Sequence, residues 1–188
     1  MIDYKITPLD IANYIILGDM KLSQQNEVIT TMFNEYRADL SDSSCQDLKT
    51  FRRTVMGYLT KYELSDDELN AASLILGEAA SRNELDLDDE NDMCDAFAKY
   101  FKITKLQIIF SPKQSKYLKL RTILREFGYQ RRTPNLIKNI SDTLEALNIE
   151  TYLKGYEQCR FCDIELDETV ILRLRPDWHT QLIKGKRS

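Results

Sequence analysis

Helix-start patterns recur along this chain of 188 residues and constrain its fold more than any other feature. Thr7-Pro8-Leu9-Asp10 offers a Thr N-cap, a Pro in the first helical position and an acid at the third. Ser65-Asp66-Asp67-Glu68 is a capping box, and Ser111-Pro112 and Thr133-Pro134 follow the same logic. Together with the apolar spacing, these patterns predict helices over residues 8–21, 25–40, 45–62, 66–81, 91–101, 113–127 and 134–147.

Apolar residues in the first four of these helices lie at helical spacing. In the helix over 45–62 they step by three and four residues and share one face: Leu48, Phe51, Val55, Tyr58 and Tyr62. The segment 8–17 is apolar nearly all round, which suits either the centre of a bundle or half of an intermolecular contact. We therefore expect residues 1–83 to form an acidic helical bundle that dimerises or docks on a partner protein.

Charge changes sign at residue 102. Residues 1–101 carry nine basic and twenty acidic side chains, a net charge of −11, whereas residues 102–188 carry seventeen basic and ten acidic ones, a net charge of +7. Within 102–138, ten Lys and Arg accompany a single acid, Glu126. A cation density of this kind is typical of surfaces that neutralise phosphates.

The basic half also contains segments that resemble strands. Residues 106–110 are a possible strand, and 161–166 and 169–174 alternate as a half-buried hairpin would. The acidic stretch 84–92 is predicted to connect the bundle to a basic domain over 93–188 that ends in a short basic tail. The expected fold class is therefore mainly α, with an N-terminal helical bundle and a C-terminal α+β domain that has a small β-hairpin.

The predicted elements of residues 91–175 follow one another as helix, strand, helix, helix and hairpin. This order resembles that of the winged-helix superfamily, without pointing to a particular family within it. The resemblance implies that the helix over 134–147 approaches the bases of DNA with its first turns.

Ten residues of the basic domain are predicted to contact nucleic acid. Phosphates would be held by Lys116, Lys119, Arg121, Arg125, Arg131 and Arg132, together with the amides that begin the helix over 134–147. Base edges would be approached by Asn135, Lys138 and Asn139, and Tyr129 would stack on an unpaired base. The acids Asp142, Glu145, Asp167 and Glu168 lie nearby in the predicted fold and would oppose such contacts.

The sequence lacks the full set of residues for a zinc site, a calcium loop or a nucleotide-phosphate loop. Cys159 and Cys162 have the spacing of half a zinc site, but His179 is the only His of the chain. Residues 86–90 begin like a calcium loop that lacks its Gly and its bidentate Glu. Since phosphate-binding Gly motifs are also absent, we expect no enzyme activity, no metal and no cofactor.

The N-terminal residues lack a secretion-signal pattern, the four Cys are scattered, and no apolar run has membrane-spanning length, so a cytoplasmic address is expected. The sequence thus predicts a non-enzymatic DNA-binding regulatory or accessory protein, with RNA as the alternative ligand. A second interpretation is an adaptor or assembly subunit whose basic helices meet an acidic protein surface. A third is an inhibitor that mimics nucleic acid with the acids of residues 84–92: Asp86, Asp88, Asp89, Glu90 and Asp92.

Overall fold

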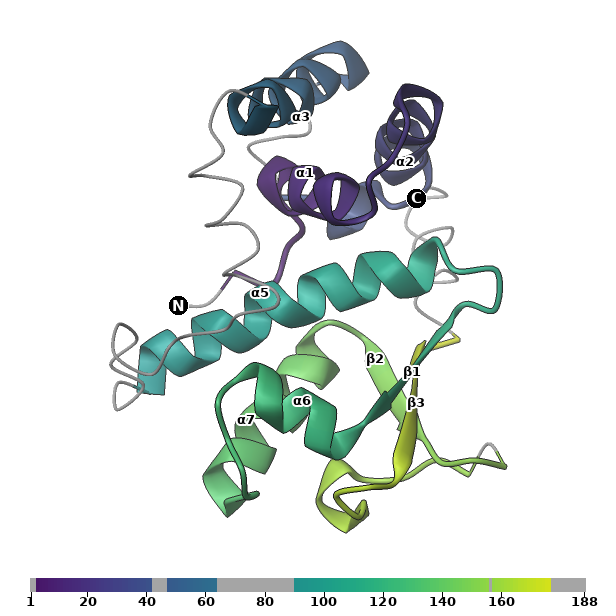
Figure 1. The fold of residues 1–188 in the computed structure, drawn as a ribbon. Coiled ribbons are helices and arrows are strands. Elements are labelled where there is room, and N and C mark those ends of the chain that lie inside the picture. Colours follow the sequence, from purple (N-terminus) through teal and green to yellow (C-terminus); the bar gives the residue numbers. More distant parts are fainter. Residues whose placement is uncertain (1–2, 42–46, 64–89, 156, 177–188) are drawn as a thin grey trace, which may run out of the picture. The chain divides into compact units, whose positions relative to one another are not determined.

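The computed structural model describes residues 3–41, 47–63, 90–155 and 157–176, and for residues 62, 63 and 90–93 it describes the backbone alone. The described residues are mainly helical and include one small antiparallel sheet (Figure 1). The chain divides into two compact units, Lys5–Ile75 and Met1–Tyr4 with Leu76–Ser188. Within the described ranges, no helix combines the length and apolar character needed to cross a bilayer.

The N-terminal unit contains three described α-helices and a short 3-10 helix: α1 (Pro8–Leu17), α2 (Leu22–Glu35), the 3-10 turn (Arg37–Asp39) and α3 (Leu48–Glu63). The predicted helix start at Pro8 is confirmed, because the Thr7 hydroxyl accepts a hydrogen bond from the Asp10 amide at 3.2 Å and the Asp10 carboxylate accepts one from the Thr7 amide at 2.8 Å. α1 packs against both α2 and α3 within this unit. Its buried face is therefore part of a small helical core.

The C-terminal unit combines three α-helices with three strands. Its described elements are α5 (Glu90–Ile109), β1 (Ser115–Lys119), α6 (Leu120–Glu126), α7 (Pro134–Ala146), β2 (Ile149–Tyr152), a 3-10 turn (Phe161–Asp163) and β3 (Thr169–Leu174). The strand order is β1-β3-β2, and β3 is antiparallel to both neighbours, pairing Ile171 with Tyr117 on one side and with Tyr152 on the other. The last strand is therefore the central one.

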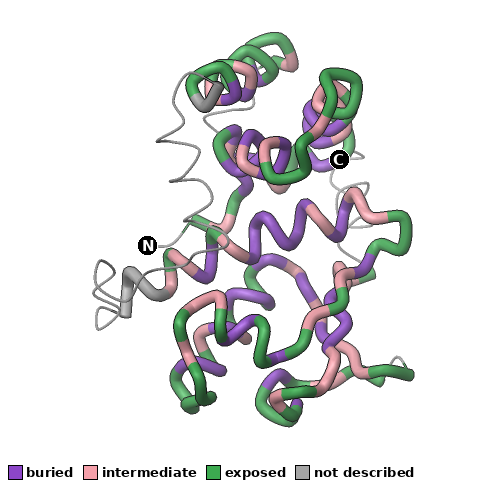
Figure 2. The backbone as a smooth tube through the Cα atoms, in the orientation of Figure 1, coloured by how far each residue is buried: buried purple, intermediate pink, exposed green. Residues whose placement is uncertain are grey.

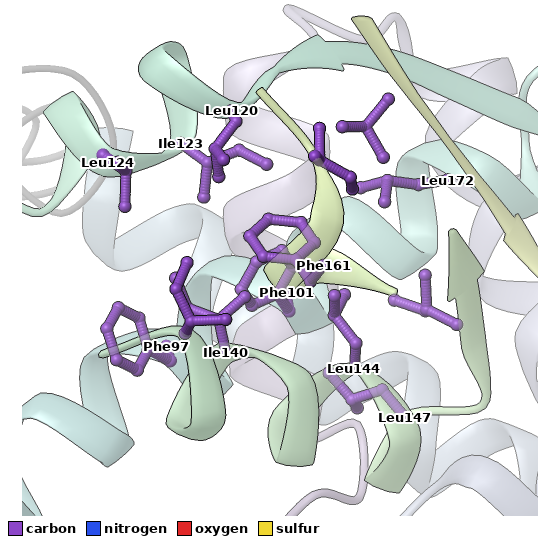
Figure 3. Close-up of a cluster of buried hydrophobic side chains, with 14 of the residues drawn as sticks. Phe97, Phe101, Leu120, Ile123, Leu124, Ile140, Leu144, Leu147, Phe161 and Leu172 are labelled. Atoms are coloured by element: carbon purple, nitrogen blue, oxygen red, sulfur yellow. The ribbon is translucent and has the colours of Figure 1, made fainter. Parts of the chain in front are cut away.

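One apolar core joins the helices of this unit to its sheet (Figure 3). Phe97 and Phe101 of α5 are fully buried in it, and Phe97 meets Phe127 edge-on with 4.3 Å between ring centroids. The helices, the 3-10 turn, β2 and β3 each contribute buried residues, β1 contributes the partly buried Leu118, and buried and exposed residues alternate along the backbone (Figure 2). The other members labelled in the close-up are Leu120, Ile123, Leu124, Ile140, Leu144, Leu147, Phe161 and Leu172.

The strand predicted over 106–110 is wrong, because residues 106–109 continue helix α5. Ile108 lies in the same buried cluster as Phe97 and Phe101. Phe101 follows Phe97 by four positions and Ile108 follows it by eleven, which is helical spacing. A short apolar run is ambiguous between strand and buried helix when it is read without its neighbours. Here the preceding helix decides the outcome.

The helix predicted over 113–127 begins seven residues late, and its first part is strand β1. The hydroxyl of Ser111 does not cap a helix; it accepts a hydrogen bond from the Ser115 amide at 3.1 Å and donates one to the Ser115 carbonyl at 3.2 Å. Gln114 adopts a positive φ of 47° in this turn. In a helix Tyr117 would share the face of Leu120 and Leu124 and be buried, but in β1 it is 46% exposed.

The predicted hairpin over 161–174 is half wrong. Thr169–Leu174 is a strand, but it pairs with β1 and with β2 (Ile149–Tyr152), a strand that was not predicted. Phe161–Asp163 forms a 3-10 turn instead of a strand. Asn148, with φ of 57°, ends α7 and turns the chain into β2. The predicted helix over 66–81 and most of the acidic connection over 84–92 lie outside the described residues.

Candidate nucleic-acid interface

Three of the predicted phosphate-binding residues act on one carboxylate, and one of them contacts it. Arg121 donates from Nε to Asp167 Oδ1 at 2.8 Å and from Nη2 to Asp167 Oδ2 at 2.7 Å, and Lys119 and Arg125 act electrostatically on the same carboxylate. The hydrogen bonds from Arg121, followed by the charges of the three cations, hold the pKa of Asp167 below its usual range. We call Lys119, Arg121, Arg125 and Asp167 the outer cluster.

Strand β1 and helix α6 supply the cations of the outer cluster. Lys119 is the last residue of β1, and α6 starts at the next position, so that Arg121 and Arg125 lie four residues apart on one helical face. Asp167 comes from the connection before β3, which is held independently by the Arg121 amide donating to the Leu166 carbonyl at 2.8 Å. Asp167 was predicted only as a nearby acid that opposes phosphate contacts, and its pairing with Arg121, 46 residues away, was not predicted.

Lys116, predicted on the same helix as Lys119, lies instead in a half-buried group against α5. Its ammonium lies 5.6 Å from the centre of the Tyr100 ring and donates a hydrogen bond to Gln107 Oε1. Burial lowers the pKa of Lys116 and raises those of Tyr100 and Glu126, while the charges of Lys116 and Glu126 favour each other. We call Tyr100, Gln107, Lys116 and Glu126 the inner cluster. Its lysine makes contacts within the fold that it would have to give up to bind a ligand.

The two adjacent arginines before α7 have different surroundings. Arg132 donates from Nη1 to the carbonyl oxygens of Cys162 at 3.1 Å and Ile164 at 2.7 Å, so it ties this connection to the segment that leads into β3. Arg131 is exposed. A phosphate would therefore compete with backbone carbonyls for Arg132. The described contacts include no such competitor for Arg131.

Tyr129, the predicted stacking residue, is half-buried against the apolar core. Its amide donates to the Leu124 carbonyl at 2.9 Å, and the amide of Gly128, with φ of 75°, donates to the Arg125 carbonyl at 2.9 Å. These two bonds form a Schellman motif, in which the residue after the Gly packs back on the helix. The ring of Tyr129 thus has a structural role at the end of α6.

Helix α7 begins where the sequence predicted. The Thr133 hydroxyl accepts a hydrogen bond from the Leu136 amide at 3.3 Å, so this cap already uses one of the amides proposed for a phosphate. The exposed stripe of the helix carries four polar residues, Asn135, Lys138, Asp142 and Glu145. Asn139 is only half-exposed, and its amide nitrogen is buried.

Two cations of the basic stretch do not contribute to an accessible surface. Lys102 and Lys105 are 6% and 2% exposed within α5. The exposed members of the predicted set are Lys119, Arg121, Arg125, Arg131, Arg132, Asn135 and Lys138. The count of charges in the sequence therefore overstated the basic surface, because neither burial nor the ion pair with Asp167 follows from composition.

Among the described residues, no three His, Cys, Asp or Glu side chains are grouped closely enough to hold a metal ion. Cys159 and Cys162 are free thiols, and burial is the largest of the effects that raise the pKa of Cys159. The calcium-like loop over 86–90, the acidic surface over 84–92, His179 and the basic tail fall outside the residues, or side chains, that the structure describes. No protein-family model, no curated protein and no solved structure matches this chain.

Proposed function

We propose that residues 90–174 form a winged-helix domain and that this protein is a non-enzymatic DNA-binding regulatory or accessory protein, with RNA as the alternative ligand. The order α5, β1, α6, α7, then the antiparallel pair β2 and β3, supports the fold assignment. In this assignment α7 is the helix that approaches the bases, and the connection between β2 and β3 is the wing.

The observation that carries the proposal is the run of exposed cations from the end of β1 to the second turn of α7. Six cationic side chains are exposed there, namely Lys119, Arg121, Arg125, Arg131, Arg132 and Lys138. The single acid within this stretch, Glu126, belongs to the inner cluster, where its charge favours the charged form of Lys116. Such a surface would hold consecutive phosphates of a backbone, while Asn135 and Lys138 approach base edges.

The test is fluorescence anisotropy with a labelled DNA duplex, titrated with the full chain from about 50 to 300 mM salt. Arg125→Ala with Arg131→Ala should weaken binding and reduce the magnitude of the log–log salt slope by about 1.8, at roughly 0.9 for each phosphate contact. Lys99→Ala with Lys113→Ala is the matched control, because both lysines are exposed in the same unit but lie outside the stretch from Lys119 to Lys138. Equal affinity and slope for both double variants would contradict the proposal; single-stranded and RNA competitors then rank the ligands.

One observation favours a second candidate, an adaptor that binds a protein. The exposed stripe of α7 carries Asp142 and Glu145 against a single cation, Lys138, and Arg121 and Arg132 already have partners within the chain. A stripe of this composition suits a mixed-charge protein surface better than a DNA groove. Co-purification with a partner that persists at high salt, without duplex binding at low salt, would favour the adaptor, since phosphate contacts weaken steeply with salt.

In both candidates the N-terminal unit would dock on a partner or on a second copy of the chain. Leu17 and Leu22, at the corner between α1 and α2, are 41% and 62% exposed. The measurement for self-association is sedimentation of the full chain over a range of concentrations. A monomer at all concentrations would limit this unit to docking on a different protein.

A further inference from the structure

The ion pair of the outer cluster has the geometry with which arginine recognises a phosphate. The guanidinium of Arg121 presents two parallel donors, Nε and Nη2, to the two carboxylate oxygens of Asp167, at 2.8 and 2.7 Å. The same fork fits two oxygens of a phosphate group. Lys119, next to α6, and Arg125, one helical turn after Arg121, add two further positive charges that favour an anion at this position.

The pair is open to solvent, and a ligand can therefore reach it. The side chain of Arg121 is 48% exposed and that of Asp167 is 68% exposed. Ion pairs with this exposure are held weakly, because water screens the attraction and two flexible side chains must be ordered. A phosphate that approached Arg121 could displace the carboxylate at little cost.

The backbone around Asp167 is held by contacts that do not use its carboxylate. The Arg121 amide donates to the Leu166 carbonyl at 2.8 Å, and Arg132 donates to the Ile164 carbonyl at 2.7 Å. The segment before β3 should therefore stay in place when the carboxylate leaves Arg121. The side chain of Asp167 can move without unfolding the connection that carries it.

We propose that Lys119, Arg121 and Arg125 form a binding site for one backbone phosphate of a nucleic acid, and that Asp167 occupies this site in the free protein as an internal competitor. This inference rests on the proposed function and adds a regulation to it. The carboxylate lowers the affinity of the unbound protein for polyanions, and it is exchanged for a phosphate on binding. Its position in the wing of the assigned fold makes the wing an inhibitor of phosphate contact until a ligand displaces it.

The test compares Asp167→Asn with Glu165→Gln in full-length protein, using the labelled duplex over the same salt range. Both changes remove one negative charge from the same exposed connection, but only Asp167 contacts Arg121 in the described structure. Asp167→Asn should bind the duplex severalfold more tightly than Glu165→Gln at a similar salt slope, because one phosphate occupies the site in both complexes. Adding Arg121→Ala to Asp167→Asn should remove this gain and reduce the magnitude of the slope by about 0.9.

Each outcome separates this inference from the proposed function. If the wild type binds the duplex and Asp167→Asn behaves like Glu165→Gln, the internal competitor is excluded while DNA binding stands. If the wild type fails to bind and Asp167→Asn binds in a manner that requires Arg121, the competitor is supported and masks the site completely. Absence of binding in both proteins, at the lowest salt, overturns the inference together with the proposed function.

Discussion

The inner and outer clusters of the C-terminal unit both contain residues of β1 and α6 but differ in burial. Each combines a lysine of β1 with a charged residue of α6: Lys116 with Glu126 in the inner cluster, and Lys119 with Arg121 in the outer one. Lys116 and Lys119 are three residues apart, so their side chains leave opposite faces of the strand. One lysine is half-buried against an aromatic ring and the other is exposed to solvent.

This difference shows that burial, and not charge, decides which cations of a basic stretch are available to a ligand. A half-buried ammonium with a ring and an amide as partners would have to give up both contacts to bind a phosphate. An exposed guanidinium paired with an exposed carboxylate exchanges one anion for another. We therefore expect the inner cluster to contribute to stability and the outer cluster to ligand binding, and three measurements of unfolding test that division.

The largest effect is expected from the two lysines of β1. Lys116→Ala should lower the free energy of unfolding by about 1–3 kcal/mol, because it removes the contact with Tyr100, the hydrogen bond to Gln107 and the aliphatic stem that covers them. Lys119→Ala is the matched control and should change it by less than about 0.5 kcal/mol, as exposed substitutions usually do. Urea denaturation followed by circular dichroism measures the stability of both variants. Equal midpoints for the two variants would contradict the different roles of the two clusters.

The contacts that define the two clusters could not be read from the sequence, whereas the helix ends could. The caps at Thr7 and Thr133 act through residues three positions away, so the local pattern carries the whole interaction. Arg121 meets Asp167 across 46 residues, through a connection whose path depends on the sheet. Both residues were named from the sequence, but no local pattern pairs them.

The errors within 106–119 have a related cause. Residues 106–110 and 113–119 each suited helix and strand. The deciding contacts were the burial of Ile108 in the apolar core in one case and the pairing of β1 with β3 in the other. Strand β2 did leave a local indication: Ile149 and Thr151 alternate with less buried residues directly after an Asn that ends a helix. The element order was thus accessible from the sequence, while the strand partners were not.

A smaller effect is expected from the pH dependence of the inner cluster. Burial raises the folded-state pKa of Glu126 above its ordinary value of 4.5, so the native protein binds this proton more tightly than the unfolded chain does. The stability gained from that proton is complete below pH 4.5 and is lost as the pH rises through the raised value. Glu126→Gln should therefore lose less stability than the wild type between these pH values. Denaturation midpoints measured across this window test the sign, with Glu145→Gln, exposed on α7, expected to follow the wild type.

The smallest effect on unfolding is expected from the outer cluster. Arg121→Ala removes two short hydrogen bonds to Asp167, yet both side chains are exposed, and surface pairs of this kind often contribute nothing measurable to stability. The backbone bond from residue 121 to Leu166 remains in the variant, so the connection to β3 keeps its attachment. Unchanged denaturation together with weaker duplex binding would assign Arg121 to the ligand. A clear loss of stability would instead make the pair with Asp167 a structural clamp, and the phosphate site would then have to be sought around Arg131 and Lys138.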